Sequence, residues 1–213
     1  ACTTAVDPIE KKPLFHFMPG SSIFSIATAG CNMRCFWCQN WQISQSKADE
    51  VPYKSLEPKE IVREAVASGC QSIAYTYTEP TIFYEYTLEI AKLARKKGLR
   101  NVVVSNGYVN REPLEELYRH IDAANIDLKG FTEELYQKYC GARLKPILEA
   151  LINIKRMKVH LEVTNLIIQG LNDGPKILKK MCEWHAKNLG DNTPLHFSRF
   201  FPSHLAMNIR PTP

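Results

Sequence analysis

Three cysteines stand within eight residues of one another, Cys31, Cys35 and Cys38, and their spacing is C-x3-C-x2-C. Thiolates grouped this closely bind zinc or iron–sulfur clusters. Zinc ribbons combine a C-x2-C pair with a second, distant pair of ligands, and ferredoxin-type clusters mostly use four cysteines. Three thiolates with no obvious fourth predict a [4Fe–4S] cluster that leaves one iron open to another ligand.

A zinc knuckle is the alternative, with His16 or His204 as its fourth ligand. The chain has seven cysteines, at positions 2, 31, 35, 38, 70, 140 and 182, an odd number that does not suit a disulfide framework. In a reducing compartment such clustered cysteines bind metal. Cys140 could donate a hydrogen atom or bind a second cofactor, but a buried free thiol is the simpler interpretation.

The composition is that of a globular protein, with 45% hydrophobic and 23% charged residues. We find neither a secretory leader nor an apolar run of the roughly 20 residues that cross a bilayer, so we expect a cytoplasmic protein without membrane contact. The net charge of +5 is mild and the basic residues alternate with acids, which argues against nucleic-acid binding. Because the chain begins at Ala1 without Met and stops soon after an apolar stretch, we expect residues 1–213 to be a single domain from a longer protein, without that protein's N- and C-terminal extensions.

Short apolar runs alternate with longer amphipathic stretches. The short runs predict buried strands at 23–27, 72–78, 101–105, 123–128, 160–168 and 194–200. The longer stretches predict helices at 60–67, 80–97, 113–120, 144–157 and 173–189. This alternation indicates an α/β fold, either a (β/α)6 partial barrel or an open doubly wound sheet, which the pattern does not separate. In both folds the chemistry lies at the carboxyl ends of the strands.

Polar residues follow several predicted strands at that end. Each also has a structural interpretation: Glu79-Pro80 suits a helix N-terminus, Asn106-Gly107 suits a turn, and Asp127 with Lys129 suits a surface. The fifth strand carries Glu162, Thr164 and Asn165, and alternation places the first two on one face and Asn165 on the other.

The sixth predicted strand carries Arg199 and His196. Arg199 in an apolar strand needs a partner, either a bound carboxylate or Asp127. We interpret His196 as a hydrogen-bonded core residue rather than a ligand.

The C-x3-C-x-aromatic-C loop, with Trp37 as the aromatic residue, resembles the signature of radical SAM enzymes. The resemblance implies a partial (β/α)6 TIM-like barrel in which the three cysteines hold the [4Fe–4S] cluster. S-adenosylmethionine (SAM) would chelate the open iron, and one electron would break its C5′–S bond. The resulting 5′-deoxyadenosyl radical would abstract hydrogen from a substrate.

The resemblance also implies contacts to SAM. Glu79 would meet the SAM amino group, and Lys129 would pair with its carboxylate. Ser105-Asn106-Gly107 and Asp127-Leu128-Lys129 resemble segments of pyruvate formate-lyase activating enzyme, but Val104 replaces an Asp of that relative, so no cation site is carried over. The predicted cofactor-binding residues are Trp37, Asn40, Glu79, Ser105, Asn106, Asp127, Lys129, Thr164 and Asn165.

A narrower resemblance is to the radical SAM protein of the AmmeMemoRadiSam system. It rests on segments 6–17, 38–41, 75–81, 124–129 and 193–200, although Phe201 replaces a His found in many members. It implies flavodoxin or ferredoxin as the electron donor and Memo-type or AMMECR1-type protein partners. The substrate is left open between a protein glycyl residue and a small molecule or nucleotide. A non-catalytic iron–sulfur electron carrier or sensor is the alternative function.

Overall fold

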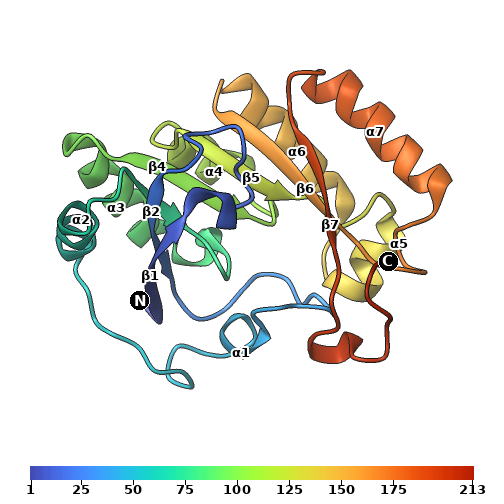
Figure 1. Cartoon of the computed structure of the whole chain (residues 1–213), viewed down its shortest axis with the longest axis horizontal. Helices are drawn as coiled ribbons and strands as arrows, with labels where there is room; N and C mark the ends of the chain where they lie inside the picture. The colour runs from blue at the N-terminus through green and yellow to red at the C-terminus, as the bar shows by residue number, and fades with distance from the viewer.

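A sheet of seven strands in chain order forms the centre of the structure, a computed structural model that describes residues 1–213 (Figure 1). Strands β2 to β7 are parallel, and β1 pairs with β2 in the antiparallel direction. A doubly wound sheet reverses its strand order, so this sequential order identifies the partial barrel. The edge strands β1 and β7 do not pair, which leaves the barrel open along one side. The strands are β1 Thr3–Pro8, β2 Ser22–Ala27, β3 Ser72–Tyr75, β4 Arg100–Ser105, β5 Ala123–Asp127, β6 His160–Ile167 and β7 Leu195–Arg199.

All six predicted strands are present as β2 to β7, whereas β1 was not predicted. The helices are α1 Trp41–Ser44, α2 Pro58–Ala67, α3 Tyr84–Lys96, α4 Arg111–Tyr118, α5 Glu133–Leu135, α6 Leu144–Arg156 and α7 Pro175–Leu189. A π-helix spans Tyr136–Cys140, and short 3-10 helices span Ile9–Lys11, Pro80–Phe83 and His204–Ala206. The predicted helix 80–97 is therefore two elements, because the chain leaves helical geometry at Phe83, with φ −120° and ψ 43°. No helix is long and apolar enough to span a bilayer.

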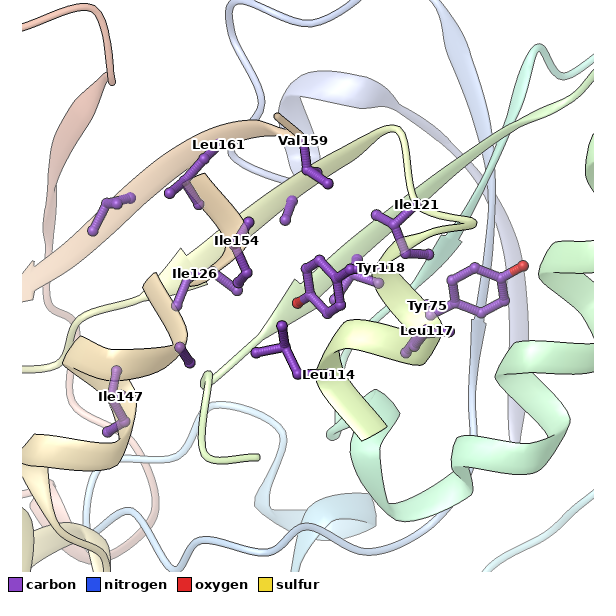
Figure 2. Close-up of a cluster of buried hydrophobic side chains, with 14 of the residues drawn as sticks. Tyr75, Leu114, Leu117, Tyr118, Ile121, Ile126, Ile147, Ile154, Val159 and Leu161 are labelled. Carbon is purple, nitrogen blue, oxygen red and sulfur yellow. The ribbon is translucent and has the colours of Figure 1, made fainter. Parts of the chain in front are cut away.

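The helices cover the outer face of the sheet. In α6 the buried residues Ile147, Ala150, Leu151 and Ile154 follow the three-and-four spacing that puts one stripe against the strands. Figure 2 shows side chains of α4 and α6 packed over strand residues such as Ile126 and Leu161. Because strands β2 to β7 are parallel, their carboxyl ends lie at a common edge of the sheet.

The inner face of the barrel is filled by the chain between β1 and β2. Ile9 and Leu14 from this connection are fully buried against Ile23, Val102 and Ala123 of the strands. We call residues 9–20 the plug segment. Because the plug occupies the amino-terminal half of the barrel, only the carboxyl-terminal half is left for a cavity.

A buried ion pair anchors the plug. Lys12, which is 1% exposed, donates from Nζ to Asp7 Oδ2 at 2.8 Å and to the Tyr77 hydroxyl at 3.0 Å. Ser25 Oγ also donates to Asp7 Oδ2, at 2.8 Å. Burial works to raise the pKa of Asp7, but hydrogen bonds from Lys11, Lys12, Tyr77 and Ser25 outweigh it and hold that pKa well below its usual range.

Asp7→Asn is expected to destabilise the protein by about 3–5 kcal/mol at neutral pH, because it leaves the Lys12 ammonium buried without a counter-charge. The folded pKa of Asp7 is depressed, so its contribution is present above its usual pKa near 3.8 and is lost as the pH falls below that value. In urea unfolding, the difference in unfolding free energy between wild type and variant should therefore become smaller as the pH is lowered below that value. Lys11→Ala is the matched control: Lys11 contacts the same carboxylate but is 58% exposed, so we expect less than about 1 kcal/mol. An equal loss in both variants would contradict this account.

Candidate functional site

A cavity of about 440 Å³ lies at the carboxyl ends of the strands, within the size range of small-molecule sites. All three clustered cysteines line it, and so do most of the predicted cofactor-binding residues. Those in its wall are Trp37, Asn40, Ser105, Asn106, Asp127, Lys129 and Thr164. Side chains from segments more than 130 residues apart in sequence thus meet at one place.

The cysteine loop is held by the π-helix. The backbone N–H groups of Arg34 and Phe36 donate to the carbonyls of Cys140 and Tyr139, each at 2.8 Å. The Tyr139 ring also packs on Phe36 and Trp37, with centroids 5.8 and 6.2 Å away. The loop is therefore shaped by protein contacts that do not depend on its sulfur atoms.

The sulfur atoms lie in a setting that suits metal binding. Burial raises the pKa of the Cys31 thiol to about 12, and a hydrogen bond with Cys140 together with burial raises the pKa of Cys35. Both thiols therefore need a nearby positive charge, such as a metal ion, to ionise near neutral pH. Asn106 Nδ2 lies 3.6 Å from Cys31 Sγ and can donate to the thiolate once it forms.

The two histidines predicted as a fourth zinc ligand lie away from the cysteines. Neither His16 nor His204 lines the cavity. His204 instead stacks on Trp41, with ring centroids 5.4 Å apart. Neither histidine therefore supplies the fourth ligand that a zinc knuckle would need here.

Glu79 does not line the cavity. Its carboxylate is fully buried and accepts four hydrogen bonds, from Thr81 N and Oγ1, from Ser105 Oγ and from Asn106 N, at 2.7–3.1 Å. Burial raises the pKa of Glu79, and the same hydrogen bonds work against that rise. In this arrangement Glu79 holds Ser105 and Asn106 in the cavity wall, and direct contact of Glu79 with a ligand stays a prediction.

Lys129 and Asp127 form an ion pair in the cavity wall, with Nζ and Oδ2 3.0 Å apart. Burial works to lower the pKa of Lys129, but the charge of Asp127 and the nearby thiols of Cys35 and Cys140 outweigh it and raise that pKa well above its usual value. The ammonium group therefore stays charged beside the cysteine loop, where an anionic group of a ligand would meet it.

The polar residues of β6, the fifth predicted strand, lie on its two faces, as the alternation of side chains predicts. Thr164 lines the cavity and accepts a hydrogen bond from Asn125 Nδ2 at 2.8 Å. Asn165 points to the other face, where its Nδ2 donates to the carbonyl of Leu128. The Asn165 side chain is fully buried and lies outside the cavity wall, so the structure does not support it as a side-chain ligand.

Two expectations for β7 have different outcomes. Arg199 is exposed and donates to the carbonyl of Thr212 at 3.0 Å, so the expected Asp127 partner is wrong, because edge strand β7 leaves this side chain in solvent; a bound carboxylate stays a prediction. His196 is hydrogen-bonded, as predicted, with Nε2 2.6 Å from Glu162 Oε2.

Three residues of the cavity wall were not predicted from the sequence. Thr76, Tyr77 and Thr78 line the cavity because the chain turns sharply after β3, with Tyr77 at φ 69°. Asn40 Nδ2 donates to the Tyr77 carbonyl at 3.0 Å and holds this turn against the cysteine loop. The aromatic and β-branched run suggested a longer strand, and its periodicity gave no signal for the turn.

Residues 25–184 match the family described as the Radical SAM superfamily. The chain belongs to the radical SAM superfamily. It is 47% identical to the uncharacterized protein MJ0808 of Methanocaldococcus jannaschii over 212 residues, covering 100% of this chain and 63% of that protein. It is 26% identical to pyruvate formate-lyase 1-activating enzyme of Escherichia coli over 162 residues, covering 73% of this chain and 65% of that enzyme. This radical SAM chain thus spans less than two thirds of the length of either relative.

Solved structures show the same fold. SuiB of Streptococcus suis, in its crystal structure bound to S-adenosylmethionine, has a TM-score of 0.66 to this chain at 12% identity. The match covers 87% of this chain and 43% of SuiB. At that identity it bears on the fold alone, which agrees with the open barrel described above.

Proposed function

We propose that this radical SAM chain binds a [4Fe–4S] cluster on Cys31, Cys35 and Cys38 and binds SAM in the adjoining cavity. When bound, the pair supplies a 5′-deoxyadenosyl radical by one-electron cleavage of the C5′–S bond of SAM. The observation that carries the proposal is the grouping of the three thiols, with Lys129 and Asn106, in the wall of a cavity of about 440 Å³.

We propose that different residues of the cavity wall contact different parts of SAM. Lys129 presents an ammonium group for the methionine carboxylate, and Asp127 keeps that group oriented. Asn106 stabilises the Cys31 thiolate, while Glu79 fixes Asn106 from behind. Thr164, Ser198 and Thr76 supply hydroxyl groups along the remaining wall. The protein's part is to bind and orient, while the cofactor supplies the difficult chemistry.

We propose that the radical abstracts hydrogen from a substrate that enters by the open side of the barrel. A protein glycyl residue is the substrate class we favour, because the relatives include a putative glycyl-radical enzyme activating enzyme of Methanocaldococcus jannaschii, 29% identical over 102 residues. A small molecule or nucleotide is the second candidate. Flavodoxin or ferredoxin as the electron donor, and association with Memo-type or AMMECR1-type proteins, stay predictions.

Spectroscopy tests the binding part of the proposal. Protein reconstituted anaerobically with iron and sulfide should contain four irons and four sulfides per chain. After reduction, its electron paramagnetic resonance spectrum should change when SAM is added, because SAM joins the open iron. A cluster whose spectrum does not change when SAM is added would support an electron carrier or sensor. Recovery of zinc alone would contradict the proposal that these cysteines bind an iron–sulfur cluster.

Lys129→Met should weaken SAM binding by about tenfold or more, since a charge-assisted contact inside a partly dehydrated cavity is lost. SAM titration of the spectroscopic change in the reduced, reconstituted protein gives the dissociation constant. Lys176→Met, at an exposed position of α7 outside the cavity, should leave it unchanged. Equal dissociation constants for wild type and Lys129→Met would show that Lys129 does not contribute to SAM binding.

A further inference from the structure

A second group of potential metal ligands lies away from the cysteines, where the plug segment meets β6 and β7. It consists of His16, Glu162 and His196, whose ligand atoms all lie within 4.8 Å of one another. Glu162 is fully buried, His196 is partly buried and His16 is exposed. None of the three lines the cavity of the cysteines, so this is a separate place in the fold.

The Glu162 carboxylate lacks a fixed cation. Its oxygens accept from the backbone N–H groups of Phe15 and His16 at 3.1 and 2.9 Å, and they lie 2.9 and 2.6 Å from Nε2 of His160 and His196. No Lys or Arg is paired with it. A fully buried carboxylate without a cationic partner is costly, and a metal ion is one way to supply the charge.

The residue types of the trio match a known kind of metal site. A carboxylate beside two imidazoles is the donor set of two His and one Glu found in zinc proteins.

We propose that His16, Glu162 and His196 bind one divalent transition-metal ion of the zinc class, separate from the cysteine cavity. Ligand atoms on a tetrahedral zinc ion lie about 3.3 Å apart. His16 is exposed and free to move closer, and its ring already stacks on that of His196, with centroids 5.9 Å apart and planes at 21°. His160 and the two backbone N–H groups orient the carboxylate from behind. Three protein ligands would leave one position of a tetrahedral ion open.

Such an ion would join three parts of the fold. His16 belongs to the plug segment, Glu162 to β6 and His196 to β7, the strand at the open edge of the barrel. Bound metal would therefore fasten the edge strand to the plug and stabilise the side of the barrel by which we propose that substrate enters.

The test uses the full chain with its iron–sulfur cluster reconstituted anaerobically, so that the cysteines are occupied, followed by addition of Zn²⁺ and removal of the excess. We expect one zinc per chain by elemental analysis, with only nitrogen and oxygen neighbours in X-ray absorption at the zinc edge. His16→Ala and His196→Ala should each weaken zinc binding by more than about tenfold. His120→Ala is the matched control, because His120 is a partly buried histidine after α4 that lies outside the trio, and this variant should bind zinc within about threefold of wild type.

The unfolding temperature, measured with and without zinc, separates a loss of metal binding from a loss of folding. Zinc should raise the unfolding temperature of wild type and of His120→Ala, but not that of His16→Ala, whose exposed side chain can be removed without disturbing the core. Absence of bound zinc, sulfur neighbours around it, or equal losses in all three variants would overturn the site. Because no step depends on SAM cleavage, failure here is distinguishable from failure of the proposed function. If the cluster cannot be reconstituted, the same measurements are made with Cys31, Cys35 and Cys38 all changed to Ser.

Discussion

Changing Cys35 to Ser is expected to reduce formation of 5′-deoxyadenosine by more than about 100-fold and to remove most of the iron from reconstituted protein. Cys35 is 8% exposed in the cavity wall, where solvent has little access to stabilise a cluster left with two thiolates. The product is measured chromatographically after incubation with SAM and dithionite, and iron is measured by elemental analysis.

The control for this change is Cys182→Ser. Cys182 is an exposed thiol on α7 that does not line the cavity, so its loss should alter neither iron content nor product. If Cys35→Ser kept a full complement of iron and wild-type product formation, the cysteine loop would not be the cluster site.

Changing Glu79 to Leu is expected to cost about 4 kcal/mol of unfolding free energy. The change leaves buried donors on Thr81, Ser105 and Asn106 without an acceptor, and each unsatisfied donor costs about 1–3 kcal/mol. Because Asn106 contacts Cys31, SAM binding should also weaken. Urea unfolding of the metal-free protein measures the first effect, and SAM titration of the reconstituted protein measures the second.

Two further variants are the controls for Glu79→Leu. Glu79→Gln keeps one carbonyl oxygen as an acceptor and should cost less than Glu79→Leu. Glu89→Leu, at an exposed position of α3, should change stability by less than about 0.5 kcal/mol. A Glu79→Leu protein as stable as wild type would show that these hydrogen bonds do not hold the cavity wall.

The strands and the cysteine loop were predictable because their signals are local. Runs such as residues 101–105 are apolar and short, and the spacing of Cys31, Cys35 and Cys38 is visible without the fold. Strand β1 was missed because it lies at the edge of the sheet, where half of its side chains face solvent and its apolar signal is weak. The π-helix at Tyr136–Cys140 has no sequence period that would distinguish it from an α-helix.

The roles of individual polar residues were less predictable, because they depend on where the chain turns. Alternation correctly separated Thr164 from Asn165, since the two faces of a strand are a local property. Glu79 was placed at the right strand end, but the burial of its carboxylate depends on residues 105 and 106, which lie at the end of another strand, β4. The grouping of His16 with Glu162 and His196 depends on the plug segment entering the barrel, which requires the whole fold.

The central claim is that this cavity binds SAM on a cluster and cleaves it. The most direct measurement is 5′-deoxyadenosine formed by anaerobically reconstituted protein after addition of dithionite and SAM, with Cys31→Ala as the negative control. We predict product from the wild-type protein and none above background from Cys31→Ala. Brown, iron-loaded wild-type protein that forms no 5′-deoxyadenosine would contradict the claim.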